Sequence, residues 1–252
     1  MKLYHYTKYS TLIKILSNYS LKYGDFTNTN DPTEFYRLSG VPYSDYTIKF
    51  GSKDLFDSFY KKVNMYKPIS LSIDVEGREG WQIPIMWAHY GDNHKGICIE
   101  IDYDKLHFSE CEVFCRVKYT NGIPQHFFLE NAKNDDNNFD QIIDEYILKN
   151  RELLLFTKET TWKFEQEFRI ISYKGEYLNI KDAITGIYFG LKNSKNDKKV
   201  KKIEKILKDS DISLYNLRMS DNGSGQYLQP EKLSDIRLVD YLNNNVKNNR
   251  KS

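Results

Sequence analysis

Apolar and polar residues follow one another along the chain with two periods, which predict strands and helices. Apolar residues at every second position, or in short continuous runs, predict strands at residues 2–7, 69–73, 96–101, 184–189, 212–219 and 236–241. Apolar residues at helical spacing predict helices at residues 53–64, 85–90, 142–156 and 195–207, and a further helix that Ser10 caps. Strands at both ends with helices between them predict one α+β domain with a mainly antiparallel or mixed sheet.

One further strand is predicted at residues 162–173, and it carries the most charge. With a period of two, Glu165, Glu167 and Arg169 lie on one face of it. Two carboxylates two residues apart repel each other unless a cation compensates them, and Arg169 is placed to do so. Because charged strand faces are commonly solvated, the residues alone favour an exposed ladder of charges.

Two other segments support local predictions. A polar loop at residues 26–30 leads to Asp31, Pro32 and Glu34, which predict a helix start: a capping acid, a proline at the first helical position, and a glutamate that reaches back. Further along, one face of a single strand is predicted to carry Cys111, Val113, Cys115, Val117 and Tyr119.

The composition is that of a folded protein. Of 252 residues, 40% are hydrophobic and 29% are charged, so the chain can bury a core. We predict a single domain over residues 1–242 and a basic polar tail at residues 243–252. A formal net charge of +2 implies no strong field over the whole molecule. Lysines gather at residues 192–208, where a solvated helix face is favoured over a binding patch.

The cysteines and the absence of long apolar runs indicate a cellular setting. The three cysteines are Cys98, Cys111 and Cys115, and an odd number without a C-x-x-C pair argues against a disulfide framework and against a zinc knuckle. The first residues lack the apolar core of a signal peptide, and no stretch approaches the roughly 20 apolar residues of a membrane span. We therefore expect a reduced, cytoplasmic protein with no membrane partner.

Residues 86–96 crowd two histidines, an aspartate and a lysine around a glycine turn. His89, Asp92 and His94 are candidate metal ligands or hydrolytic groups, but their spacing matches no common helix-borne zinc motif, so no metal is predicted. A second interpretation is an edge that holds an anionic or aromatic ligand. A third is a helix end whose polar side chains satisfy local backbone groups.

Five motifs follow one another between residues 3 and 190. They are L-Y-H-Y-T at 3–7, N-D-P-x-E at 30–34, S-L-S at 70–72, M-W-A-H-Y-x-D-x-H-K-G at 86–96, and W-x-x-E-x-E-x-R-I-I at 162–171. Their order resembles a bacterial domain-of-unknown-function family. That family in turn resembles the ADP-ribosyltransferases, including the DNA-modifying toxin of a toxin–antitoxin pair.

The resemblance implies a fold and an activity. The fold would be α+β, with the split mixed and antiparallel sheets of ADP-ribosyltransferases and flanking helices. NAD would be the substrate, and the acceptor would be a nucleic acid or a protein. A toxin or phage-defence role would follow, with an antitoxin or regulator as a further partner.

The resemblance also assigns roles to residues. His5 would hydrogen-bond a ribose hydroxyl and orient NAD, and Glu167 or Glu165 would be the glutamate of a late strand. The middle position of the triad falls on Tyr90, or on the Ser-rich segment 70–72. Further residues expected to contact NAD are Tyr6, Thr7, Ser70, Ser72, Trp87, His89 and Arg169.

Two alternatives to a transferase stay open at this point. One is a non-catalytic module on the same scaffold that binds a nucleotide, or a nucleic acid through the Lys-rich helix at residues 195–208 and exposed tyrosines. The other is a hydrolase that uses His89, Asp92 and His94, with or without a metal.

Overall fold

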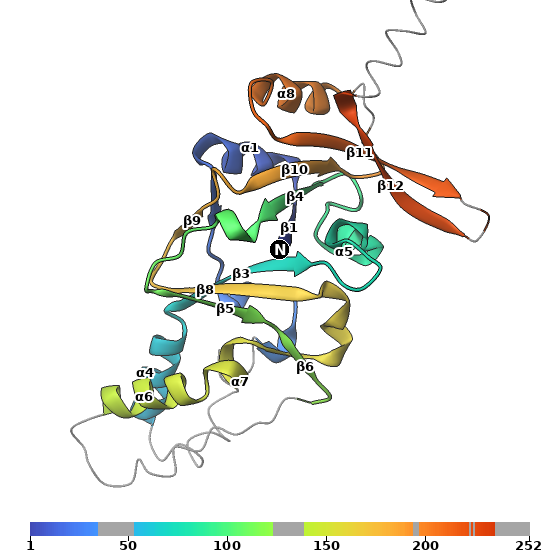
Figure 1. Cartoon of the computed structure of the whole chain (residues 1–252). Coiled ribbons are helices and arrows are strands. Elements are labelled where there is room, and N and C mark those ends of the chain that lie inside the picture. The colour runs from blue at the N-terminus through green and yellow to red at the C-terminus, as the bar shows by residue number, and fades with distance from the viewer. Residues whose placement is uncertain (35–52, 123–138, 194–196, 222, 224, 235–252) are drawn as a thin grey trace, which may run out of the picture. The chain divides into compact units, whose positions relative to one another are not determined.

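The computed structural model describes residues 1–34, 53–122, 139–193, 197–221, 223 and 225–234 (Figure 1). These residues divide into two compact units. The first unit comprises Met1–Ser20, Leu71–Leu106 and the described residues from Asn179 onward. The second comprises the described residues of Leu21–Ser70 and His107–Leu178. The single domain over residues 1–242 stays a prediction, and residues 243–252 lie outside the described part of the chain.

The first unit is built on strands that are mostly antiparallel. Their order is β12 (Gln226–Lys232), β11 (Ser213–Asp221), β10 (Ile184–Phe189), β4 (Ile97–Asp102), β1 (Lys2–Thr7) and the end of β3 (Tyr66–Ile73). Among these described neighbours only β10 and β11 run parallel, and α8 (Lys198–Ile206) lies between these two strands in the sequence. A parallel pair needs such a crossover because a tight turn cannot join its strands.

Helices complete the first unit. They are α1 (Tyr9–Asn18) and α5 (Pro84–His89), with 3₁₀ turns η2 (Gly80–Gln82) and η3 (Tyr103–Lys105). Helix α1 buries Leu12, Ile15 and Leu16. The strands β4 and β10 bury residues on both faces, which is why their sequences are continuously apolar rather than alternating.

The second unit contains three groups of paired strands. Strand β8 (Glu167–Tyr173) lies between β3 and β5 (Glu112–Arg116) and is antiparallel to β5. Two further sheets have two short strands each. In one, β2 (Ser20–Lys22) pairs with β9 (Tyr177–Asn179), and in the other β6 (Lys118–Thr120) pairs with β7 (Thr157–Glu159). The pair β6–β7 is parallel. The remaining elements are η1 (Phe26–Asn28), α4 (Lys53–Val63), α6 (Phe139–Lys149), α7 (Arg151–Leu155) and η4 (Thr160–Glu165).

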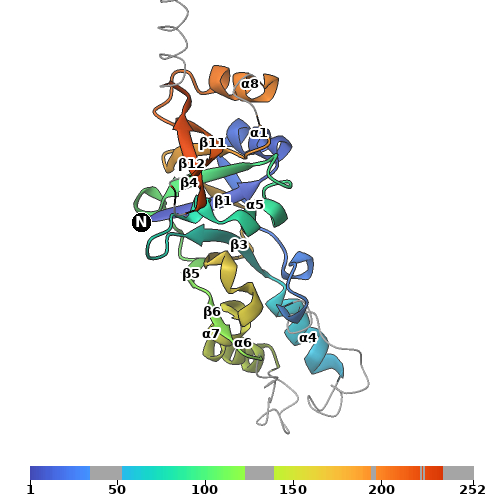
Figure 2. The same ribbon diagram turned by 90° about the vertical axis from the view of Figure 1, so that its right-hand side faces the viewer.

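An apolar core forms within the second unit where α4, α6 and α7 meet the strand β8. Helices α4 and α6 lie side by side in both views (Figures 1 and 2), and Phe59 contacts the ring of Tyr146 edge-on. The buried members of this core are Phe26, Phe59, Val63, Ile143, Ile147, Leu154, Leu155, Phe156 and Ile171.

The α+β class is confirmed, with a mixed and largely antiparallel arrangement of strands. Strands β1 and β10 have the predicted bounds, and α4 ends one residue earlier than predicted. None of the described helices is both long and apolar enough to cross a membrane.

Several boundaries were wrong for identifiable reasons. Helix α1 begins at Tyr9 and its preceding residue Lys8 makes no side-chain cap, so Ser10 lies inside the helix rather than capping it. The helix predicted at 142–156 is two helices, α6 and α7. The polar loop at residues 26–30 contains the turn η1, which buries Phe26.

One predicted strand is divided, and another strand was missed. The strand from Cys111 to Tyr119 is two strands, β5 and β6, because Val117 between them donates its N–H to the carbonyl of Glu167. The structure adds β12, which the sequence analysis missed. The strand predicted at 236–241 lies outside the described residues.

A pair of leucines tests the core of the second unit. Leu154 is fully buried, whereas the side chain of Leu148 is 66% exposed. We expect Leu154→Ala to lower the free energy of unfolding by about 2–5 kcal/mol, because it leaves a cavity. Leu148→Ala should stay within about 0.5 kcal/mol. Urea unfolding of both variants checks this, and equal losses would contradict the described core.

Candidate functional site: a buried ion cluster

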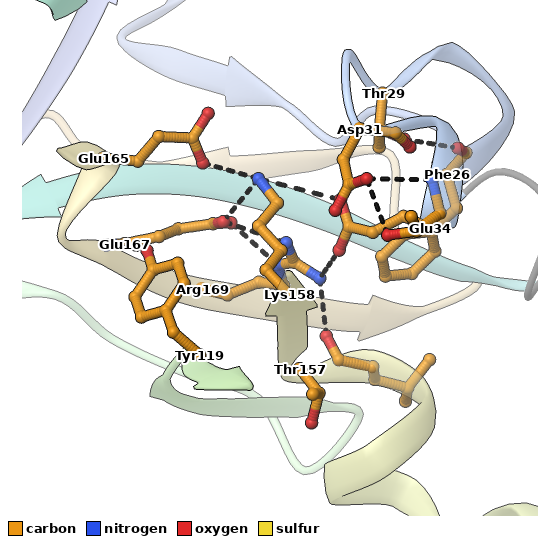
Figure 3. Close-up of polar contacts among 12 residues, drawn as sticks. Phe26, Thr29, Asp31, Glu34, Tyr119, Thr157, Lys158, Glu165, Glu167 and Arg169 are labelled. Atoms are coloured by element: carbon orange, nitrogen blue, oxygen red, sulfur yellow. Dashed lines mark hydrogen bonds and ion pairs between the residues drawn. The ribbon is translucent and has the colours of Figure 1, made fainter. Parts of the chain in front are cut away.

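Five charged side chains meet in the interior of the second unit (Figure 3). They are Glu34, Lys158, Glu165, Glu167 and Arg169, which we call the ion cluster. Each is at most 5% exposed. Lysine, arginine and glutamate are almost never this buried unless they are paired. The exposed ladder of charges favoured by the sequence is therefore wrong.

The cluster is centred on Arg169 and Glu167, which share one face of β8. Arg169 Nε donates to Glu167 Oε1 at 2.7 Å, and Nη2 donates to Oε2 at 2.9 Å. This bidentate contact is the geometry in which a guanidinium binds a carboxylate most strongly. Arg169 Nη1 also donates to the carbonyl of Leu155 at 2.7 Å, and its guanidinium lies 5.3 Å from the ring centre of Phe26.

Lys158 on β7 joins the acids of the cluster. Its Nζ lies 2.5 Å from Glu165 Oε2, 2.9 Å from Glu167 Oε2 and 3.7 Å from Glu34 Oε2. The same nitrogen lies 5.7 Å from the ring centre of Trp162. One ammonium therefore contacts three carboxylates, which offsets part of the repulsion among them.

Glu34 reaches the cluster from a short helical segment at residues 32–34. The predicted capping acid is confirmed, since Asp31 Oδ1 accepts from the Thr33 N–H at 2.8 Å and from the Thr33 hydroxyl at 2.7 Å. Glu34 was predicted to reach back to the cap. Instead its Oε1 lies 2.6 Å from Arg169 Nη1, because a buried guanidinium attracts a carboxylate more strongly than a backbone N–H does.

Glu165 and Glu167 belong to different elements. Glu165 ends the turn η4, and the next residue, Gln166, has a φ of 47°, so the predicted strand cannot run through it. Strand β8 starts at Glu167, whose N–H donates to the hydroxyl of Tyr119 at 3.0 Å. The two acids are thus brought together through Lys158 rather than by strand alternation.

The charges in the cluster hold one another ionised. Burial alone would raise the pKa of Glu167, but Arg169, Lys158 and hydrogen bonds from Arg169 and Ser70 lower that pKa far below its usual range. Burial alone would lower the pKa of Lys158, but Glu167 and Glu34 raise it above its usual value. Glu167 is therefore held as a carboxylate at neutral pH.

An exposed residue, Ser70, also acts on the cluster, since it helps to lower the pKa of the buried Glu167 carboxyl. The second unit therefore assembles four of the residues for which the sequence predicted a role: Ser70, Glu165, Glu167 and Arg169. Lys158 and Glu34 were missed as site residues, although Glu34 stood in one of the quoted motifs.

The other predicted site residues lie in the first unit. His5 is half-buried on β1, between the buried side chains of Tyr4 and Tyr6. Tyr6 donates its hydroxyl to the carbonyl of Gly80 at 2.6 Å, and its ring meets that of Trp87 edge-on. Thr7 and Ser72 are buried on β1 and β3. His89 ends α5 and is exposed, and Tyr90 follows it, half-buried.

Residues 91–96 form a turn in which three non-glycine residues have left-handed backbone angles. Asp92, Asn93 and His94 all have left-handed φ angles, of 49°, 52° and 67°. The carbonyl of His94 accepts from the N–H of Lys192 at 3.0 Å, and a Cβ on Gly190 would come within 2.4 Å of that carbonyl. Burial, and then the charge of Lys192, lowers the pKa of His94. A Cβ on Gly96 would likewise come within 2.4 Å of the carbonyl of Thr7, so this glycine of the motif has a packing role within the first unit.

No group of three or more His, Cys, Asp or Glu side chains suited to a metal ion occurs in the part of the chain that the structure describes. The roles assigned to His89, Asp92 and His94 in a hydrolase stay a hypothesis.

Comparison with protein-family models gives a match over part of the chain. A family model described as "protein of unknown function (DUF2971)" matches residues 86–170. The matched range includes Lys158, Glu165, Glu167 and Arg169, together with the motif at residues 86–96. It supports the expected resemblance to a domain-of-unknown-function family. No curated protein and no solved structure gives a significant match.

A pair of lysines on neighbouring strands tests the cluster. Lys158 is buried, and Lys118 on the paired strand β6 makes an exposed ion pair with Glu152. Lys158→Met should cost about 3–5 kcal/mol of unfolding free energy, because it leaves buried carboxylates without their cation. Lys118→Met should cost about 0–1 kcal/mol. Chemical denaturation decides the matter, and a small loss in Lys158→Met would argue against the pairing.

The lowered pKa of Glu167 sets a pH dependence. Since that pKa is lower in the folded than in the unfolded protein, the stabilisation is complete above the unfolded value of about 4.3 and is lost as the pH falls through the folded value. We expect the unfolding free energy of the wild type to drop between about pH 5 and 3, and that of Glu167→Gln to drop less steeply. Urea titrations at several pH values test this. Parallel pH profiles for the two proteins would refute it.

Proposed function

We propose that the protein is an NAD-dependent ADP-ribosyltransferase. The order of the five motifs supports this proposal, as does the carboxylate of Glu167 that the ion cluster holds ionised. By the same resemblance, the protein would act as a toxin or phage-defence effector on a nucleic acid or protein. An antitoxin or regulator would then be a further partner.

The proposed reaction breaks the bond between nicotinamide and ribose. Nicotinamide leaves with the electron pair of that bond, and positive charge builds on the ribose carbon. The acceptor then attacks this carbon with a lone pair and gives up its proton. A fixed carboxylate in a site shielded from water stabilises such a developing charge more than it would in water. Glu167 is the acid that we assign to this role.

The observation that carries the proposal is the set of contacts made by the Glu167 carboxylate. A carboxylate offers about four acceptor positions, and Arg169 and Lys158 engage three of those of Glu167. Breaking one of these contacts would leave a buried charge without its partner. Ser70, which contributes to the low pKa of Glu167, is by contrast uncharged and exposed. A ribose hydroxyl that takes its place exchanges one neutral group for another, at little net cost.

The cations of the cluster serve this chemistry by fixing the acid. Arg169 grips both oxygens of Glu167, so the carboxylate cannot rotate when substrate binds. Lys158 ties Glu167 to Glu165, which we assign as a second acid of the site. Preorganised charges of this kind need no rearrangement during the reaction.

The remaining roles follow from the resemblance. His5 orients the ribose, and Tyr90 takes the middle position of the triad. Aromatic and hydroxyl groups of Tyr6, Thr7, Ser72, Trp87 and His89 are assigned to contacts with NAD.

A second candidate function is a non-catalytic module that binds a nucleotide or a nucleic acid. The observation that favours it is the internal pairing of both Glu165 and Glu167 with Lys158, which gives these acids a structural role. Binding of NAD without release of nicotinamide would select this candidate.

Release of nicotinamide from labelled NAD tests the proposal, with duplex DNA, single-stranded DNA, RNA or cell extract as acceptor. We expect release by the wild type with at least one acceptor. Glu167→Gln should lower the rate by about 10²–10³-fold, as the loss of other preorganised groups does.

Two further variants separate chemistry from folding. Glu34→Gln removes a carboxylate from the same cluster and reports the cost of disturbing it, while Glu152→Gln alters an exposed glutamate and should leave the rate unchanged. Thermal unfolding is measured for all variants. The proposal fails if the wild type releases no nicotinamide with any acceptor, or if Glu34→Gln loses as much rate as Glu167→Gln at equal stability.

A further inference from the structure

One side of α8 is covered with lysines. Helix α8 presents Lys198, Lys199, Lys201, Lys202 and Lys205, all of which are exposed. Its opposite side is apolar and packs into the first unit through Val200 and Ile203. The helix is therefore held by one face and offers the other to solvent.

The position of α8 is fixed at its first turn. The side chain of Asp197 accepts from the N–H of Lys199 at 2.7 Å and caps the helix. Lys199 Nζ lies 5.4 Å from the ring centre of Tyr9, where α8 lies beside the start of α1 (Figures 1 and 2). The lysines are thus carried on a rigid element rather than on a loose segment.

This arrangement has an electrostatic cost in the isolated protein. Lys198 and Lys202 are four residues apart, as are Lys201 and Lys205, so the pairs stand next to each other on the helix surface. Like charges at this spacing destabilise a helix by about 0.2–0.5 kcal/mol per pair. A polyanion bound along this side removes the repulsion.

We infer that the lysine side of α8 binds the phosphate backbone of a nucleic acid. From Lys198 to Lys205 the helix rises about 10 Å, which matches about three phosphates along one strand of a duplex. The surface supplies point charges and no fixed fork for base edges, so we expect binding without sequence preference. The inference extends the proposed function by naming the class of acceptor, and it does not require that the protein split NAD.

Other anionic partners fit this surface less well. A helix that binds a membrane sinks its apolar face between lipids, and the apolar face of α8 is occupied by the unit itself. The centre of a protein interface is rich in aromatic residues and poor in lysine, unlike the side formed by Lys198, Lys201, Lys202 and Lys205.

The test is a binding measurement without NAD. Fluorescently labelled duplex DNA, single-stranded DNA and RNA are titrated with the full chain at salt concentrations between 50 and 200 mM, and log affinity is plotted against log salt. A triple variant with Lys201, Lys202 and Lys205 replaced by glutamine removes the surface. A matched variant replaces three other exposed lysines of the first unit by glutamine, Lys14, Lys181 and Lys232.

The expected result is a difference in salt slope between the two variants. For duplex DNA the triple variant should lose about 2–3 from the magnitude of the slope, since each lost phosphate contact removes about 0.9. The matched variant, which has the same net charge, should keep the wild-type slope. The inference is overturned if both variants bind alike, or if the wild type binds none of the three nucleic acids at 50 mM salt.

Two competitors distinguish nucleic acid from other polyanions. Vesicles of phosphatidylcholine with phosphatidylserine, and polyglutamate, are added at equal charge concentration. Retention of the labelled nucleic acid supports the inference, whereas equal displacement by either competitor overturns it. Because NAD is absent, failure here leaves the transferase proposal standing, and failure of the nicotinamide assay leaves this one standing.

Discussion

The buried contact between Arg169 and Glu167 is the interaction on which the second unit depends. Taking each of these charges out of water costs several kcal/mol, and only close pairing offsets the cost. Three other segments therefore supply charges that complete the pairing. They are the helical segment with Glu34, the strand with Lys158 and the turn with Glu165. The second unit therefore encloses charges that are stable only when they are paired.

This requirement also fixes the register of β8. A slip of one residue would turn Glu167 and Arg169 to the face that now holds Phe168 and Ile170, away from Lys158 and Glu34. In a purely apolar strand, the same slip would cost only part of the packing energy. The ion cluster thus makes the structure specific, even where an apolar replacement of all its members would be no less stable.

The sequence predicted what depends on local pattern. Strands β1 and β10 have their predicted bounds, and Asp31 caps a helix start as expected, because periodicity and capping involve residues near one another. The break at Gln166 was missed, since a left-handed residue flanked by apolar and charged neighbours leaves no mark in the alternation. Strand β12 was missed because Pro230 and several polar residues interrupt the apolar alternation that would indicate a strand.

The site was predictable only in part, for a related reason. The carboxylates and Arg169 could be singled out because they alternate within a few residues. That Lys158 joins them depends on the pairing of β6 with β7, and that Glu34 joins them depends on a contact far apart in the sequence. Burial was misjudged for the same reason, since charged residues look solvated until their distant partners are known.

The structural role of Glu167 and the catalytic role that we propose for it are compatible, because they use different acceptor positions of the carboxylate. The contacts from Arg169 and Lys158 cannot be given up without leaving a charge in the interior, so they belong to the scaffold. Ser70, which helps to lower the pKa of Glu167, is uncharged and exposed, so its place is the one that a substrate hydroxyl could take in the reaction that we propose. A carboxylate held at three acceptor positions, with a fourth that a neutral hydroxyl can occupy, is what a preorganised electrostatic catalyst requires.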